Sequence, residues 1–149
     1  MKITEALFAE HQIFHNLFDH IEATAPAMRT IAEVRRVAAM LETMLKAHSD
    51  TEHDLFLGPL EHCFEEFGQR DSILAEHTEI DSNLHKIHHA KHVDEARQDL
   101  LAAVAYSRCH FDKEERFVFP LAERLLKHDT LTALGQAWME QRNRALLPS

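Results

Sequence analysis

Histidines and glutamates recur in this sequence at one constant separation. Three pairs are each 62 residues apart: His15 and His77, His48 and His110, and Glu52 and Glu114. The same shift superposes most of an inner stripe and one aspartate: Ile31 on Val93, Val34 on Ala96, Ala38 on Leu100, Leu41 on Ala103, Leu45 on Ser107, Leu55 on Phe117 and Asp19 on Asp81. Internal self-similarity of this kind indicates two copies of one structural unit. We therefore expect two similar halves related by approximate twofold symmetry.

Apolar residues follow a helical spacing of three and four positions through most of the chain. The predicted helices cover about residues 3–25, 31–58, 71–90 and 94–120, and a last helix runs from about residue 121 with a break near Thr130. The expected N-caps are Thr4, Asp71 or Ser72, and Asp94. A short turn over residues 59–67 is expected to end at Gly68. This pattern predicts an all-α fold, an up-down-up-down four-helix bundle with an internal twofold repeat and an extra C-terminal helix.

Length and charge limit the classes of partner. The chain has 149 residues and a formal charge of -9, and we expect one domain over residues 1–149, with a core at 3–122 and a helical extension at 123–149. No basic cluster suits nucleic acid or an anionic membrane, and no apolar run reaches the roughly 18 residues of a membrane span. We expect a cytoplasmic protein in which Cys63 and Cys109 are buried thiols.

Two segments carry a histidine and a glutamate four positions apart, His48-x-x-x-Glu52 and His110-x-x-x-Glu114. This spacing puts an imidazole and a carboxylate on one helix face, and both pairs interrupt an apolar stripe. A single such pair is more often a solvated ion pair, but two pairs with partner histidines at one offset favour a metal site. Nitrogen and oxygen ligands together suit non-haem iron, with manganese or zinc as substitutes. The predicted metal ligands are His15, His48, Glu52, His77, His110 and Glu114.

These segments resemble the hemerythrin-like family of HHE cation-binding domains. That family has a histidine on the first helix, HxxxE on the second, a histidine on the third and HxxxE on the fourth, and the resemblance covers about residues 10–122. It implies two iron ions with a bridging oxo, hydroxo or water ligand. It also implies the ligand assignment: one iron is held by His15 and His48, the other by His77 and His110, and both are bridged by Glu52 and Glu114.

The sequence departs from the oxygen-carrying hemerythrins, which have two histidines four apart on the third helix and HxxxxD on the fourth. Here the third helix has His77-x-x-x-Asp81 and the fourth has HxxxE. Six protein ligands would leave each iron an exchangeable position, so the resemblance implies binding of, or reaction with, O2, peroxide or nitric oxide in sensing or stress response. Iron storage or delivery, including iron–sulfur repair, oxygen carriage, and a structural bundle with adventitious metal are the alternatives. Whether the protein is an enzyme stays open.

Four further residues lie near the predicted ligands in the sequence. His11 is one turn before His15, but the shift of 62 places an isoleucine at its counterpart, so we expect it to flank a ligand or an entry channel. Asp19 and Asp81 each follow a predicted ligand histidine by four residues, and they either orient imidazoles or are ordinary polar positions. Tyr106 either reaches the site or packs at the edge of the bundle.

Two segments fall outside the repeat. The histidine-rich stretch His85–His92 is expected to be a solvated helix end that complements the helix dipole, with transient metal loading as the alternative. The last helix, which carries Trp138, either covers the bundle or forms a dimer surface. The chain is accordingly expected to be a monomer or a homodimer.

Overall fold

The described part of the chain consists of helices. The computed structural model describes residues 1–61 and 69–145, and no strand occurs among them. The predicted all-α fold is confirmed. The elements are α1 (Ile3–Thr24), the 3-10 turn η1 (Ala25–Ala27), α2 (Ile31–Glu52), the π-helical turn η2 (His53–Leu57), α4 (Gln69–His89), α5 (Val93–Lys113), the π-helical turn η3 (Glu114–Val118), α6 (Phe119–Leu125) and α7 (His128–Ala145).

The start of α2 shows how the sequence sets a helix boundary. The Thr30 hydroxyl accepts a hydrogen bond from the Glu33 backbone N–H at 3.2 Å, and the Glu33 carboxylate accepts one from the Thr30 backbone N–H at 2.9 Å. This capping box satisfies two backbone donors that have no partner within the helix. It therefore fixes where α2 begins after the turn that follows α1.

The predicted ends of the first and last helices need correction. Thr4 is not the N-cap of α1, because the helix begins at Ile3 and the buried Thr4 hydroxyl donates instead to Glu123 Oε1 at 2.7 Å. The break predicted near Thr130 lies earlier, between Leu125 and His128, where the chain is extended. Tertiary contacts thus override the local signals at both places.

The predicted N-caps of the third and fourth helices are also wrong. α4 already includes Asp71 and Ser72, since it begins at Gln69, and the residue that caps α5 is His92 rather than Asp94. Both aspartates lie in the first helical turn, where a negative charge interacts favourably with the helix dipole. The acidic residues therefore indicated the helix starts to within two residues.

Some predictions fall on parts of the chain that the structure does not describe. The predicted turn is described only as far as residue 61, so its end at Gly68 lies outside the described residues, as does Cys63. Cys109 is described and is exposed, so its prediction as a buried thiol is wrong. It faces away from the interior that its neighbour His110 enters.

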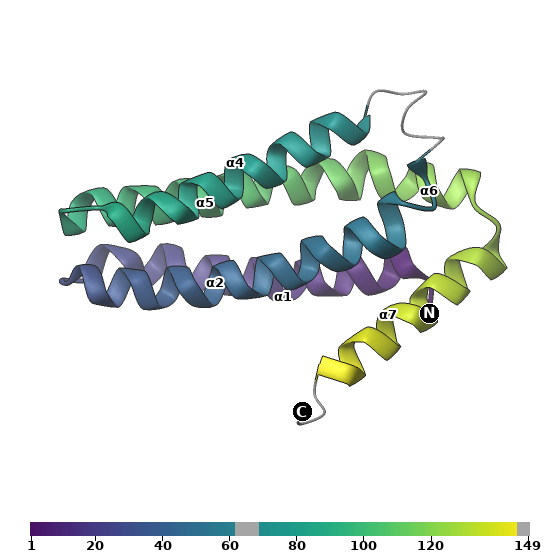
Figure 1. The fold of residues 1–149 in the computed structure, drawn as a ribbon, viewed down its shortest axis with the longest axis horizontal. Helices are drawn as coiled ribbons and strands as arrows, with labels where there is room; N and C mark the ends of the chain where they lie inside the picture. The colour runs from purple at the N-terminus through teal and green to yellow at the C-terminus, as the bar shows by residue number, and fades with distance from the viewer. Residues whose placement is uncertain (62–68, 146–149) are drawn as a thin grey trace.

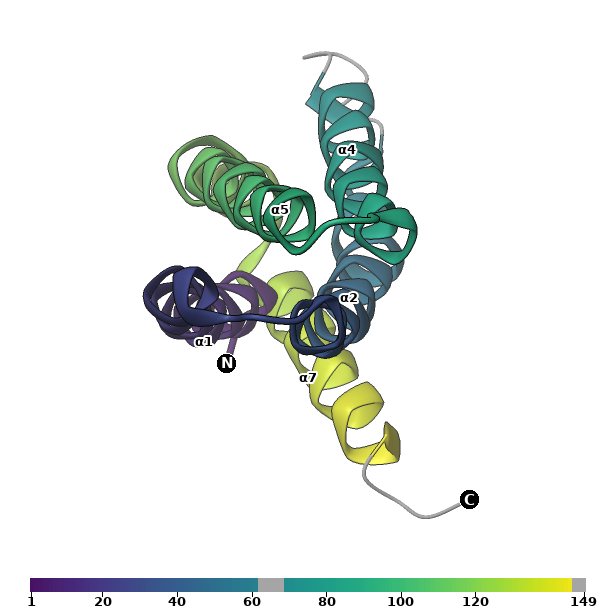
Figure 2. The ribbon, with the colours of Figure 1, turned by 90° about the vertical axis from the view of Figure 1, so that its left-hand side faces the viewer.

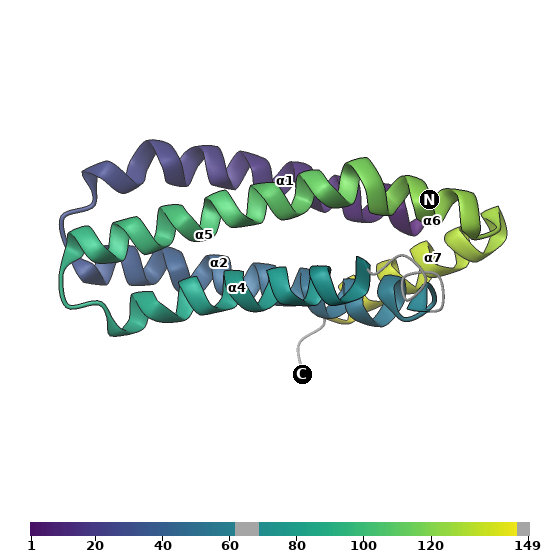
Figure 3. The same cartoon turned by 90° about the horizontal axis from the view of Figure 1, so that it is seen from above.

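Figure 1 shows α1, α2, α4 and α5 side by side along the long axis of the molecule. The connection from α1 to α2 and the connection from α4 to α5 lie at the same end, as Figure 3 shows from above. Seen from that end, α1 lies beside α5 and α2 beside α4, with α7 below α1 and α2 (Figure 2). Contacts join α5 to each of the other three helices. Among the described helices, none has the length and hydropathy needed to cross a membrane.

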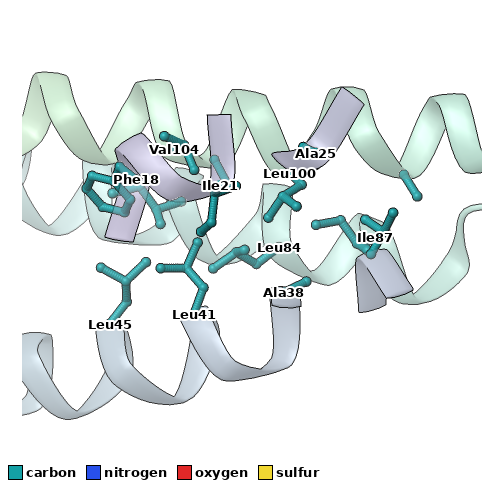
Figure 4. Packing of buried hydrophobic residues seen from close by; sticks show 14 of the residues in the cluster. Phe18, Ile21, Ala25, Ala38, Leu41, Leu45, Leu84, Ile87, Leu100 and Val104 are labelled. Atoms are coloured by element: carbon teal, nitrogen blue, oxygen red, sulfur yellow. The ribbon is translucent and has the colours of Figure 1, made fainter. Parts of the chain in front are cut away.

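Apolar side chains form two clusters at different levels along these helices. Near the two helix connections, Phe18, Leu41 and Leu84 are among the fully buried members of the first cluster (Figure 4). The second cluster lies toward the opposite end, and α7 contributes to it. Its buried members are Ile3, Leu7, Phe56, Leu57, Leu60, Ile73, Val118, Phe119, Ala122 and Leu131. Polar side chains fill the layer between the two clusters.

The start of α1 approaches α7 so closely that only glycine fits at one position. A Cβ atom at Gly135 would lie 2.1 Å from the Met1 carbonyl oxygen and 3.1 Å from the Ile3 nitrogen. We expect Gly135→Ala to displace α7 and to lower the free energy of unfolding by about 1–3 kcal/mol, as overpacking does. Urea denaturation followed by circular dichroism measures this loss.

A matched control is available at Gly58, in the turn that follows η2. A Cβ atom at Gly58 would lie 3.5 Å from its nearest neighbour, the Asp54 carbonyl oxygen, and the backbone there is right-handed helical. Gly58→Ala should therefore leave stability unchanged or raise it by about 0.4–1 kcal/mol. Equal losses in the two variants would show that Gly135 is not required for close packing.

Candidate metal centre

The layer between the two apolar clusters contains histidine and glutamate side chains that are almost wholly shielded from water. At most 2% of each is exposed for His11, His48, Glu52, His110 and Glu114, and the side chain of His77 is 13% exposed. They come from α1, α2, α4, α5 and the first residue of η3. This low exposure shows that both HxxxE pairs point into the interior. Burying so many polar groups is costly unless they have partners.

Two groups of these residues could each hold a metal ion. The candidate ligand atoms lie within 4.8 Å of one another in each group, and Glu114 belongs to both: Glu52, His77, His110 and Glu114 form one, and His11, His48 and Glu114 form the other. Nε2 of His11 lies 3.2 Å from Nε2 of His48, and the corresponding distance from His77 to His110 is 2.8 Å. Two imidazoles on one ion, with bonds of about 2.0–2.1 Å, bring their nitrogens about 3 Å apart.

The carboxylates of Glu52 and Glu114 test whether a metal fits. All four of their oxygens are buried, and none has a hydrogen-bond partner among the described residues. Histidine Nε2 atoms nevertheless lie close: those of His110 and His11 are 2.8 and 3.2 Å from Glu114, and that of His77 is 3.3 Å from Glu52. A divalent cation would supply the partner that these oxygens lack. Imidazole and carboxylate donors together fit a first-row transition metal.

The two glutamates also influence each other's ionisation. Burial raises the pKa of Glu114 well above its usual value, and the charge of Glu52 raises it further. Burial opposes ionisation of Glu52 as well, but the close approach of His77 and the nearby charges of His48 and His110 lower its pKa overall. The pair therefore keeps a proton when no cation is bound, and a bound cation favours full ionisation.

His11 is held in the form that a metal needs. Burial lowers its pKa to about 2, and the charge of His48 contributes further. The imidazole is consequently neutral near pH 7, and neutral imidazole is the form that binds metal ions. The Phe111 ring stacks against it, with ring centroids 3.8 Å apart, and this contact fixes the ring orientation.

A carboxylate supports each of the two histidine pairs. Glu10 Oε2 lies 2.6 Å from His48 Nδ1, and Glu76 Oε2 lies 2.7 Å from His110 Nδ1. The hydrogen bond to His110 is the main cause that lowers the pKa of Glu76 to about 2. Such a carboxylate fixes the tautomer of a ligand histidine and directs its other nitrogen toward the metal.

The sequence-based prediction missed both supporting glutamates, although a signal was present. Ala9-Glu10-His11 and Ala75-Glu76-His77 are identical tripeptides 66 residues apart. The shift of 62 aligns the second and fourth helices but not the first and third. An offset of 66 residues pairs Glu10 with Glu76 and His11 with His77.

The structure differs from the prediction at His15. Its side chain is 27% exposed, and its Nδ1 lies 3.1 Å from Arg108 Nη1, outside both candidate groups. The inward position belongs to His11, which fills the gap between the buried residues Leu7 and Phe14 at helical spacing. The predicted roles of the two α1 histidines are thus exchanged.

The three remaining predicted neighbours lie on the surface. Asp19 pairs with Arg108 at 2.5 Å, and Asp81 is exposed on the outer side of α4. Tyr106 is 49% exposed, which agrees with packing at the edge rather than with a place in the site. The carboxylates that contact the site imidazoles are therefore Glu10, Glu76 and Glu115, which lies 3.0 Å from His11 Nδ1, and not the two aspartates.

Each buried glutamate lies at the start of a π-helical turn. η2 follows Glu52 directly, and η3 begins at Glu114. Single π-helical turns inside α-helices occur often at functional sites, because they change the direction of side chains locally. Their presence after both HxxxE pairs matches the repeat that the sequence predicted for these segments.

Comparison with known proteins finds no protein-family model, curated protein or solved structure that matches the chain. Its function is therefore inferred from the geometry and chemistry of the site.

Proposed function

We propose that the chain is a hemerythrin-like di-iron protein, folded as an up-down-up-down four-helix bundle, that binds or reacts with O2, peroxide or nitric oxide. Its role would be sensing or stress response in the cytoplasm. The observation that carries the proposal is the pair of buried carboxylates, Glu52 and Glu114, whose oxygens lack hydrogen-bond partners among the described residues. The four surrounding histidines support it, since they supply imidazole nitrogen donors.

Each residue of the centre has a definite part in this proposal. His11, His48 and Glu114 would hold one iron, and Glu52, His77, His110 and Glu114 would hold the other. Bound iron would supply one-electron chemistry and open coordination positions for a small ligand. The chain contributes a low-dielectric layer between two apolar clusters, and it holds the imidazoles in place.

A cavity beside His48 supports a small and largely apolar ligand. It has a volume of about 220 Å³ and lies between α1, α2 and α7. Its lining consists of Glu10, Ile13, Phe14, Met44, Ala47, His48 and Arg142. Most of these side chains present carbon to the cavity, and the charged groups of Glu10 and Arg142 line one part of it.

The proposal is tested by anaerobic iron loading followed by exposure to oxygen, peroxide or nitric oxide. We expect about two irons per chain, the number that two ligand groups sharing a carboxylate would hold, and a new absorption band on addition of at least one of the three ligands. A stable band with O2 would indicate carriage or sensing, whereas consumption of peroxide would indicate an enzyme. Far fewer than two irons, with no spectral change, would refute the proposal.

A further inference from the structure

The C-terminal helix α7 contacts the centre through the supporting glutamate of one half. Glu10 Oε1 accepts hydrogen bonds from Trp138 Nε1 at 3.1 Å and from Arg142 Nε at 2.7 Å. The other oxygen of the same carboxylate is the one that meets His48 Nδ1 at 2.6 Å. A continuous chain of polar contacts therefore runs from α7 through Glu10 to a candidate metal ligand.

Arg142 is itself tied to the helix that carries His48. Its Nη1 donates to Thr51 Oγ1 at 2.9 Å, and its Nη2 reaches the Ala47 carbonyl oxygen at 3.4 Å. The guanidinium group also lies over the Trp138 ring, 5.8 Å from the ring centroid. These contacts fasten α7 on both sides of His48, and the close approach at Gly135 fixes the middle of the helix.

The second half of the centre has a different support. Glu76 Oε1 accepts a hydrogen bond from Lys113 Nζ at 2.7 Å, and the same ammonium group donates to Ser72 Oγ at 2.5 Å. These residues belong to α4 and α5 themselves, and no described residue of α7 takes part in these contacts. The side chain of Glu76 is 34% exposed, against 14% for Glu10.

The histidines that α1 and α4 contribute to the two groups also differ in exposure, and again the half that contains His77 is the more exposed. The side chain of His77 is 13% exposed, whereas that of His11 is fully buried. A metal leaves a site when its imidazoles turn away and water or a competing ligand enters. Both steps are easier in the half that His77 and His110 form.

We propose that Trp138 and Arg142 are positioning residues that make the two metal sites unequal. This inference rests on the proposed di-metal function. The ion held by His11 and His48 is retained, because His48 cannot turn without breaking its hydrogen bond with Glu10, a carboxylate that Trp138 and Arg142 of α7 hold in place. The ion held by His77 and His110 exchanges first. One half is thus built to keep its metal and the other to release it.

Iron release to a chelator tests the inference. Protein loaded anaerobically with Fe2+ is mixed with an excess of a chromogenic ferrous chelator, and colour is followed with time. We expect two phases of similar amplitude whose rates differ by about 10- to 100-fold, the range over which groups that support metal ligands act. In the double variant Trp138→Phe, Arg142→Gln we expect the slow phase to accelerate by about tenfold or more and the fast phase to stay unchanged.

Matched variants separate positioning from general damage. Lys113→Gln loosens the support of Glu76 and should accelerate only the fast phase, while Arg142→Lys should restore part of the slow phase. Circular dichroism establishes that each variant is folded. Release of both irons at one rate from the unmodified protein would overturn the inference but not the proposed function. So would a slow phase that the double variant leaves unchanged, and a protein that retains no iron would contradict both.

Discussion

Replacing His11 with alanine is expected to remove about one of two bound irons, whereas replacing His15 with alanine should leave both in place. His11 Nε2 lies 3.2 Å from His48 Nε2 and from Glu114 Oε2, in the buried layer. His15 lies at the surface beside Arg108. Removing one neutral imidazole from a three-residue group leaves too few protein ligands to hold an ion firmly. Anaerobic iron quantitation after gel filtration measures the difference.

The two variants control each other, because both change a histidine on α1, one turn apart. A loss of iron in His15→Ala with full retention in His11→Ala would restore the ligand set that the offset of 62 predicts. Loss in both variants would point to damage of α1 as a whole, and thermal denaturation would reveal it as a lowered midpoint. The predicted outcome, loss in His11→Ala alone, requires that the register of α1 is the one described.

The helix pattern and five of the six residues of the two candidate groups could be read from the sequence. In α2 and α5 the histidine and glutamate of HxxxE occupy inward positions on an apolar stripe, so helical geometry alone determines their direction. The residues that are 62 positions apart in these two helices, His48 with His110 and Glu52 with Glu114, all lie in the candidate groups.

The choice between His11 and His15 needed information that the repeat did not contain. Six residues separate α1 from α2, at positions 25–30, but only three separate α4 from α5, at positions 90–92. The first hairpin is therefore longer than the second: His11 and His48 are 37 residues apart, whereas His77 and His110 are 33 apart. The connections account for three of these four residues, and the first and third helices align at a separation of 66 instead of 62. One constant offset cannot describe both pairs of helices, and the error amounts to one helical turn.

The support from α7 was beyond the reach of sequence patterns for a different reason. Glu10 and Arg142 are 132 residues apart, and neither stands at a position that helical spacing marks as buried. Their pairing depends on how α7 lies across α1, which the contact at Gly135 decides. A local pattern predicts which face of a helix is apolar, but it does not predict where a separate helix packs against that face.

Replacing Glu114 with glutamine is expected to stabilise the metal-free protein while it weakens metal binding. Glu114 and Glu52 are fully buried, and burial together with the charge of Glu52 raises the pKa of Glu114 well above its usual value. When the metal-free protein folds at neutral pH, a carboxyl group that is ionised in the unfolded chain must therefore take up a proton or lose its hydration. Replacing Glu114 with glutamine removes this cost and is expected to raise the free energy of unfolding by about 1–3 kcal/mol. Urea denaturation of the metal-free proteins measures the change.

Iron should reverse the order of stability. Unmodified protein with Fe2+ at about 1,000 times the dissociation constant gains about 4 kcal/mol by mass action, whereas Glu114→Gln should gain much less. The exposed residue Glu140 provides the control. Glu140→Gln should change the free energy of unfolding of the metal-free protein and of the iron-loaded protein by no more than about 0.5 kcal/mol each. Destabilisation of the metal-free protein by Glu114→Gln would mean that the glutamate has an ordinary structural role. The opposite effects in the two states follow only if the fold tolerates this pair of carboxylates for the sake of a cation.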